Sequence, residues 1–355
     1  MVDFDVTVIG AGPAGLASAI KCAKKGLKVL VIERETLGRH KPCGGLLTPI
    51  CKDLILEEFE KEIPKEVMCT PERLGLYYVP PSGRKNGGHM RNYKLLNVNR
   101  DLFDYWLWEL AEKSGVQTCL KTEFINLEQS DPIQVTVKRE EKVNQLTTNF
   151  LIGADGVYSR VRKLLYNKER IKILPVLQEY WRADGNFDDF YYVFLKEEIT
   201  SSCAYVIPKD HQYIIGIGAT KENSESITFL IQEFKKWLNR DFDFTEIELM
   251  KEEAWSIPYG FSKFGKENVI LVGDAAGFCN VFSGEGIRFA IESGVAAALS
   301  VQESLNKGEP LVNAYEKEIE WINRLVNMTY EFATLLTDRK REEFVKTELA
   351  RIASI

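Results

Sequence analysis

Histidine and closely paired cysteines are scarce in this chain of 355 residues. It has three histidines, at positions 40, 89 and 211, which argues against a histidine-rich metal site. The seven cysteines form no CxxC pair and their number is odd, so neither a zinc site nor a disulfide scaffold is expected. Scattered thiols in a long chain favour a reducing compartment.

The sequence also lacks a long apolar run and an excess of positive charge. No apolar stretch reaches the roughly 18 residues that a membrane helix needs, and Asp3 and Asp5 stand where a signal peptide would be basic. The net charge is −6 and no basic stripe is present, so nucleic acid is not an expected partner. We expect a cytoplasmic protein, and we leave peripheral contact with a membrane surface open.

The N-terminal segment has the pattern of a strand, a glycine turn, a helix and a second strand. FDVTVI at 4–9 and VLVIE at 29–33 are apolar and rich in β-branched residues, which indicates buried strands. Leu16, Ile20 and Ala23 recur at helical spacing between them. Two strands joined by a crossover helix predict a parallel sheet.

The turn itself, GAGPAG at 10–15, has the glycine spacing of a dinucleotide-binding loop. Gly10 permits the tight turn, Gly12 lets the backbone approach a pyrophosphate, and Gly15 allows the helix to pack closely on the strand. The helix N-terminus offers unpaired N–H groups to phosphates. Glu33 follows about 20 residues later and can bind a ribose diol. The alternative is a glycine turn with a structural role alone.

Two further turns place an acid beside a glycine at the end of an apolar strand. They are Asp155-Gly156 and Gly273-Asp274. A carboxylate at such a position can bind sugar or ribityl hydroxyls, although each residue alone could also be a turn-forming aspartate.

Another glycine-rich stretch, SGEGI at 283–287, precedes a long helical pattern. Its small residues let backbone amides reach a ligand, and the start of the helix favours negative charge there. The alternative is a glycine-rich helix start without a ligand.

The order of these motifs along the chain resembles that in FAD enzymes of the glutathione-reductase type. Within this type it is similar to the branch that contains aromatic hydroxylases and geranylgeranyl reductases. KPCGGLL at 41–47 and RDLFD at 100–104 are similar to motifs of the geranylgeranyl reductase family, above all its short bacterial CbrA-like branch. The resemblance implies FAD as cofactor. The residues expected to contact FAD are Gly10, Gly12, Pro13, Ala14, Gly15, Glu33, Arg34, Gly44, Gly45, Arg100, Phe124, Asp155, Gly156, Gly273, Asp274, Gly284, Gly286 and Ile287.

The resemblance also implies a reaction, namely hydride transfer from reduced flavin to a carbon–carbon double bond of an isoprenoid-type apolar or lipid substrate. In this interpretation Gly44 and Gly45 let the backbone pass close to the flavin. Cys43 lies near flavin or substrate and either donates a proton or packs as an inert thiol. The electron donor is NAD(P)H or ferredoxin, and no metal is expected. A flavin monooxygenase or halogenase on the same scaffold and a non-catalytic FAD-binding protein are the alternatives.

The predicted fold class is α/β, with a Rossmann-like FAD-binding domain, an inserted and mainly antiparallel substrate domain, and a helical C-terminal tail. The FAD domain is expected to comprise 1–68, 97–170 and 263–310, the substrate domain 69–96 and 171–262, and the tail 311–355. A Tyr-x-Trp-x-Phe-Pro segment of the reductases is replaced here by Cys203–Pro208. Tyr205, Ile207 and Pro208 are therefore the predicted pocket residues.

Overall fold

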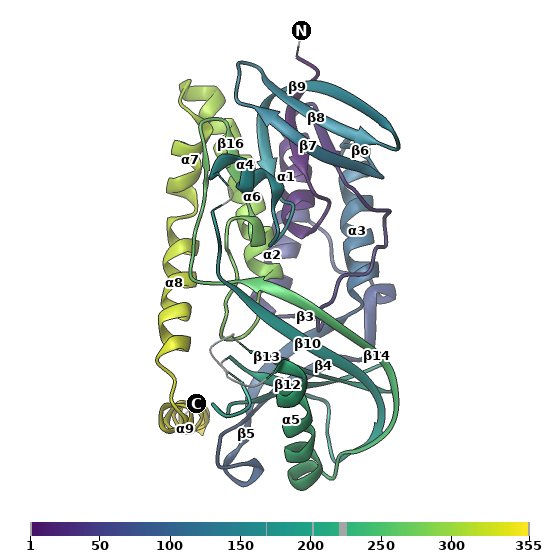
Figure 1. Cartoon of the computed structure of the whole chain (residues 1–355), viewed down its shortest axis with the longest axis vertical. Coiled ribbons are helices and arrows are strands. Elements are labelled where there is room, and N and C mark those ends of the chain that lie inside the picture. Colours follow the sequence, from purple (N-terminus) through teal and green to yellow (C-terminus); the bar gives the residue numbers. More distant parts are fainter. Residues whose placement is uncertain (1, 168, 201, 220–225, 354–355) are drawn as a thin grey trace.

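The computed structural model describes residues 2–167, 169–200, 202–219 and 226–353. Two eight-stranded sheets, here called sheet A and sheet B, follow one another along the long axis of the molecule (Figure 1). The predicted α/β fold class is confirmed, including a mainly antiparallel second sheet and a helical C-terminal end.

Sheet A has a parallel centre in the order β16–β9–β1–β2–β6. Strands β2 and β16, and the C-terminal parts of β1 and β9, are buried and apolar, as expected of a parallel sheet that is covered on both faces. The strands of sheet A are β1 (Phe4–Ile9), β2 (Val29–Ile32), β6 (Gln117–Cys119), β7 (Thr122–Glu128), β8 (Ile133–Arg139), β9 (Lys142–Gly153), β15 (Gly265–Lys266) and β16 (Val269–Leu271).

Sheet B follows the order β14–β10–β13–β12–β11–β4–β5–β3, and all its pairs are antiparallel except β4 with β11. One of its faces packs on helix α5 through an aromatic cluster that includes Phe194, Phe234 and Phe242. Its strands are β3 (Leu46–Leu47), β4 (Met68–Val79), β5 (Gly88–Val98), β10 (Ile173–Asp184), β11 (Phe190–Phe194), β12 (Ala204–Lys209), β13 (Gln212–Gly218) and β14 (Thr245–Pro258).

Several helices begin at a residue whose side chain caps the first turn. Thr48, Asn99 and Ser226 each accept a hydrogen bond from a first-turn N–H group, which starts α2, α3 and α5. The helices are α1 (Pro13–Lys24), α2 (Pro49–Phe59), α3 (Arg100–Lys113), α4 (Arg160–Leu165), α5 (Ile227–Phe242), α6 (Ile287–Lys307), α7 (Leu311–Glu318), α8 (Glu320–Thr334) and α9 (Asp338–Ala353), with 3₁₀ turns η1 (Lys65–Val67), η2 (Arg84–Asn86) and η3 (Gly273–Ala275).

The C-terminal helices connect the two sheets. Helices α7 and α8 run along one side of the molecule from sheet A towards sheet B, where α9 lies (Figure 1). The buried Arg341 of α9 donates a hydrogen bond to the carbonyl of Thr200, at 3.0 Å, and Phe344 packs edge-on against Tyr78 of β4. Within the described ranges, no helix has the length and apolar character needed to cross a membrane.

Candidate active site

A cavity of about 1140 Å³ lies between the two sheets. On one side it is lined by the carboxyl ends of parallel strands in sheet A, at Ile9, Ile32 and Val272. On the other side it is lined by residues of sheet B such as Leu174 and Val193. Ligands of open α/β sheets bind in the crevice beyond the carboxyl ends of the strands, so this is the expected place for a cofactor.

The GAGPAG turn joins β1 to α1, and its three glycines have different reasons to be glycine. Gly10 has a φ of +107°, and a Cβ on it would lie 2.5 Å from the Ala154 carbonyl oxygen. A Cβ on Gly15 would lie 2.0 Å from the Gly10 carbonyl oxygen. For Gly12 the nearest atom is Nη2 of Arg39 at 3.8 Å, so the space beside Gly12 is open to a ligand.

Glu33 follows β2 and points its carboxylate back at this turn. Its Oε2 accepts the Ala11 N–H at 2.8 Å, and its Oε1 accepts the Glu35 N–H at 3.0 Å. Arg39 lies 3.7 Å from the same Oε2 atom. The side chain is therefore buried and fixed, with lone pairs left to accept hydrogen bonds from a diol.

Asp155 follows β9, and its two carboxylate oxygens differ in their hydrogen bonds. Its Oδ2 accepts the N–H groups of Arg160 at 2.6 Å and Val161 at 3.1 Å, at the start of α4. Its Oδ1 is buried and has no hydrogen-bond partner among the described residues. Burial raises the pKa of this carboxyl group. Gly156, at φ +75°, leaves open space next to it.

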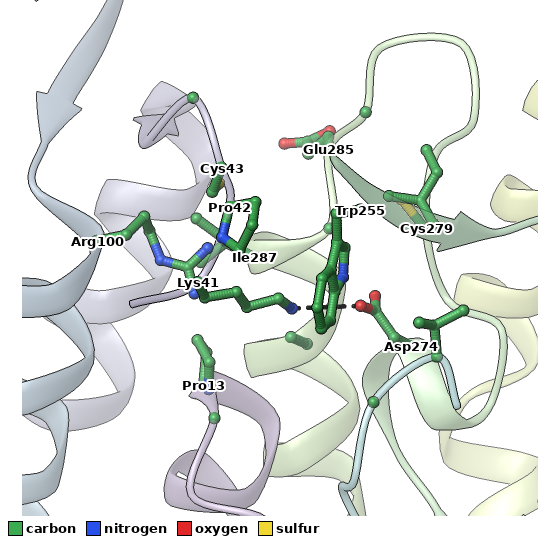
Figure 2. A pocket seen from close by; sticks show the side chains of 18 of the residues that line it. Pro13, Lys41, Pro42, Cys43, Arg100, Trp255, Asp274, Cys279, Glu285 and Ile287 are labelled. Atoms are coloured by element: carbon green, nitrogen blue, oxygen red, sulfur yellow. Dashed lines mark hydrogen bonds and ion pairs between the residues drawn. The ribbon is translucent and has the colours of Figure 1, made fainter. Parts of the chain in front are cut away.

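Asp274 follows β16 and pairs with a lysine from the opposite wall. Figure 2 shows Lys41 extended across the cavity, with its Nζ 3.4 Å from Oδ2 of Asp274. The preceding Gly273 has a φ of +56°, its N–H donates to Oγ of Ser293 at 2.9 Å, and a Cβ on it would lie 3.0 Å from that of Ala14.

The SGEGI stretch ends at the start of α6, for which Gly286 is the cap residue. Gly284 has a φ of +70° and open space beside it, and Glu285 accepts a hydrogen bond from the Thr48 hydroxyl at 2.8 Å. The first turn of α6, beginning at Ile287, lines the cavity, and the first N–H groups of a helix have no partner within it.

Cys43 lies beside Arg100 in the loop that leads into β3 (Figure 2). Its Sγ accepts the Gly45 N–H at 3.4 Å. Burial disfavours the thiolate, but Arg100, this N–H group and Lys41 outweigh burial and lower the pKa of the thiol. The Arg100 guanidinium donates hydrogen bonds of 2.9 to 3.2 Å to the Asp104 carboxylate on the same helix. It also hydrogen-bonds Cys43.

Gly44 and Gly45 lie close to other parts of the protein, which leave little space for a side chain. A Cβ on Gly45, which has a φ of +66°, would lie 2.1 Å from the Val98 carbonyl oxygen and 2.6 Å from Nζ of Lys209. A Cβ on Gly44 would lie 2.6 Å from Cδ1 of Ile207. Protein atoms of sheet B and its neighbours thus fill the space, although both glycines also line the cavity.

On sheet B, Tyr205 lies flat across the neighbouring strand β13. A Cβ on Gly216 would lie 2.1 Å from Cζ of the Tyr205 ring. This position brings the Tyr205 hydroxyl to 2.8 Å from Oε1 of Gln178, which in turn hydrogen-bonds Glu253. Glu253 also accepts from Tyr180 at 2.8 Å, and contacts His40 and Lys251 at 2.6 and 2.7 Å, so all its acceptor positions are used.

Most of the residues predicted from the sequence line this cavity. Cys43, Tyr205 and Ile207 do so, as do all the predicted cofactor residues except Gly15 and Gly273, which pack just behind it. Pro208 also lies behind the lining, where its carbonyl accepts a hydrogen bond from Asn97. The roles of these residues stay predictions.

The cavity also contains residues that the sequence did not single out as site residues. Among them are Lys41, Gln178, Glu253, Tyr78 and Tyr93. Lys41 was within reach of prediction, because it precedes the PCGG residues. The others lie on alternating strands whose aromatic residues are equally compatible with an ordinary sheet core.

Known proteins are similar to this chain in sequence and in fold. Residues 3–328 match the family described as FAD binding domain. Protein CbrA of Escherichia coli K12 is 31% identical over 307 residues, which cover 82% of each chain.

Two solved structures illustrate the shared fold. A geranylgeranyl bacteriochlorophyll reductase-like protein of Thermoplasma acidophilum superimposes with a TM-score of 0.83 at 22% identity, covering 97% of this chain and 91% of that one. Aklavinone-11 hydroxylase superimposes with a TM-score of 0.70 at 19% identity, covering 92% and 68%. The chain therefore belongs to the FAD binding domain family, and its cofactor is FAD.

Proposed function

We propose that this FAD-dependent oxidoreductase reduces carbon–carbon double bonds of an apolar, isoprenoid-type substrate. The observation that carries the proposal is the continuity of the cavity. It leads from the glycine and acid turns of sheet A directly to a largely apolar wall on sheet B, formed by residues such as Leu76, Leu174 and Val193. A substrate on that wall would lie next to a cofactor held by the turns.

The residues present are suited to FAD. The open space at Gly12 and the N-terminus of α1 suit the pyrophosphate, and Glu33 suits the ribose diol of the adenosine half. Asp274 suits the ribityl hydroxyls. The unpaired Oδ1 of Asp155 is a buried acceptor that needs a donor, and a hydroxyl of the cofactor would supply one.

When bound, reduced FAD supplies a hydride. The second requirement of double-bond reduction is a proton, because an isolated alkene is a poor acceptor of hydride. Cys43 is our candidate donor. Arg100 lowers the pKa of its thiol, so the thiolate left after proton transfer would be stabilised. The start of α6 at Gly286 and the ammonium group of Lys41 would add positive potential on the other side of the cavity.

The test is an anaerobic single-turnover experiment. The holoprotein is reduced with dithionite and mixed with polyprenyl alcohols and lipids, and flavin absorbance and product mass are followed. The proposal expects reoxidation of the flavin and a product heavier by two hydrogens, with Cys43→Ala retaining FAD but reacting about 100-fold more slowly. Repeating the reduction with NAD(P)H and with ferredoxin identifies the donor.

A monooxygenase is the second candidate. The fold is shared with aklavinone-11 hydroxylase and with the halogenase CmlS, and Trp255 of the segment Trp255–Pro258 lines the cavity. This function predicts no anaerobic reoxidation by any lipid, and a product that gains oxygen or halogen in air. A protein that binds FAD but turns over nothing under either condition would be non-catalytic.

A further inference from the structure

Four tyrosines from four strands of sheet B line one part of the cavity. They are Tyr78 of β4, Tyr93 of β5, Tyr191 of β11 and Tyr205 of β12, and we call them the phenol cluster. Val193 is the register partner of both Tyr78 and Tyr205, so these two side chains stand in one row on the same sheet face. The rings of Tyr191 and Tyr205 lie 6.3 Å apart.

The hydroxyls of the phenol cluster are neutral donors, and two of them have no partner. Burial raises the pKa of all four phenols. Tyr205 donates to Gln178, and Tyr191 hydrogen-bonds the weakly polar thiol of Cys203. Across the described residues, the hydroxyls of Tyr78 and Tyr93 make no hydrogen bond.

The side chains packed around these donors are mostly apolar, although Glu285 and Arg288 lie near Tyr93. Leu76, Leu95 and Val193 are buried around them, and Phe282 closes the wall towards α9. A pure hydrocarbon in this place would displace water from the hydroxyls without replacing its hydrogen bonds. A ligand with a carbonyl oxygen would bury the same apolar surface and accept those hydrogen bonds as well. Sites built around such polar groups reject analogues that lack the matching atom.

We propose that the substrate carries a carbonyl oxygen conjugated with the double bond that is reduced, and that Tyr78 and Tyr93 bind this oxygen, with Tyr191 beside them. The inference rests on the proposed reductase function and deepens it. It assigns the substrate to the α,β-unsaturated carbonyl compounds with an apolar skeleton.

This substrate class removes the difficulty posed by an isolated alkene. When a hydride adds to the β-carbon, the π electrons shift and the negative charge develops on the carbonyl oxygen. The phenol hydroxyls donate hydrogen bonds to that oxygen as its charge grows, which lowers the barrier. The resulting enolate takes one proton at its α-carbon, from the Cys43 thiol or from water. One hydride and one proton thus convert the double bond into a single bond.

The experiment compares three probes with one C15 skeleton: farnesal, which has the conjugated carbonyl, farnesol, which has a hydroxyl, and farnesene, a hydrocarbon. Binding to the oxidised holoprotein is measured from the change in the flavin visible spectrum, which requires no turnover. We expect farnesal to bind at least about 10-fold more tightly than farnesene. The double variant Tyr78→Phe/Tyr93→Phe should remove this preference while retaining FAD.

Tyr77→Phe is the matched control. Tyr77 is adjacent in sequence, but it packs on the opposite face of sheet B with Tyr192, so its loss should leave the preference unchanged. Equal affinity for farnesal and farnesene, or a preference that persists in the double variant, would overturn the inference.

A reduction arm separates this inference from the proposed function. Selective binding of farnesal that depends on the phenol cluster, without anaerobic reoxidation of reduced flavin, would support the carbonyl site and remove the reductase function. Reduction of farnesene at the same rate as farnesal would support the reductase function and remove the carbonyl site.

Discussion

The two walls of the cavity are built by different means. On sheet A, consecutive residues in short turns form the wall, and the backbone determines where ligand atoms can lie, as at Gly12 and Gly156. On sheet B, side chains from strands far apart in the sequence form it, as with Tyr78 and Tyr205. A turn can be recognised as a local motif, whereas a row of side chains across strands exists only after the sheet has formed. We therefore expect substitutions on the two walls to have separable effects.

The largest effect is expected at the GAGPAG turn, where packing and ligand space can be separated. Gly15→Val would place a side chain 2.0 Å from the Gly10 carbonyl oxygen, which is backbone and cannot move aside. We expect the free energy of unfolding in urea to fall by about 3 kcal/mol or more. FAD content should fall with it, because the turn would be distorted.

Gly12→Ser is the matched variant in the same turn. Serine is a favourable cap residue and its Cβ would have open space, so the free energy of unfolding of the apoprotein should stay within about 0.5 kcal/mol. FAD affinity should nevertheless fall, because the side chain enters space assigned to the cofactor. Unchanged FAD affinity in Gly12→Ser would contradict that assignment.

The acids of sheet A come next in expected effect. Glu33→Ala and Asp274→Ala each remove a charged acceptor assigned to the cofactor, and we expect FAD affinity to fall about 10- to 100-fold. Isothermal titration of the apoproteins with FAD measures this. Glu248→Ala removes the same charge at an exposed position on sheet B, where Glu248 pairs with Arg182, and should have no effect. Normal FAD content in both cavity variants would refute the placement.

On sheet B, Gly216→Ala tests the position of Tyr205. The added methyl group would lie 2.1 Å from the Tyr205 ring, so we expect a loss of about 1–3 kcal/mol of unfolding free energy while FAD affinity is retained. Because the cause is a single side chain, adding Tyr205→Ala should make Gly216→Ala nearly neutral in a double-mutant cycle. Additive losses would show that Tyr205 lies elsewhere.

The smallest effect is a shift in pH dependence at Cys43, which lies between the two walls. Because the thiolate is the reactive form and the pKa is lowered, alkylation by iodoacetamide should reach its plateau at lower pH than for an ordinary thiol of pKa about 8.5. Arg100→Gln should move the profile to higher pH. The depressed pKa also means that the thiolate stabilises the fold above the unfolded-state pKa, and that this contribution is lost as the pH falls through the folded-state pKa.

Site-resolved mass spectrometry distinguishes this thiol from the others. Burial raises the pKa of Cys22 to about 12, and it also raises those of Cys51, Cys203 and Cys279. These thiols should therefore react slowly with iodoacetamide across the tested pH range. If Cys43 is alkylated no faster than Cys22 at pH 7, a lowered pKa of the Cys43 thiol is ruled out.

The sequence predicted what depends on local backbone geometry. The glycine turn and its flanking elements, β1 and α1, followed from residue spacing, because only glycine tolerates the φ of Gly10 or the close approach at Gly15. The acids at strand ends could also be predicted from local sequence, because each directly follows an apolar strand. Parallel strands end at one sheet edge, so acids that follow them converge on one cavity.

What the sequence could not provide depends on register. Tyr205 reaches Gln178 only because Gly216 lies between them on β13, and this requires the pairing of three strands to be known. The packing role of Gly45 was missed because the Val98 carbonyl that excludes a side chain comes from a distant part of the chain. Tyr205 was predicted as a pocket residue, but its grouping with Tyr78, Tyr93 and Tyr191 was not, because these tyrosines have the same alternating pattern as sheet residues that face α5.

The parallel pairing of β4 with β11 has a consequence for biosynthesis. Gly75 pairs with Phe190, and four of the eight strands of sheet A lie between them in the chain. On the ribosome, β4 and β5 therefore emerge long before their neighbour in the sheet is translated. Contacts between such distant segments form slowly, and the waiting hairpin presents an unprotected strand edge to other molecules. We therefore expect the early hairpin to be the part of sheet B most exposed to aggregation during translation.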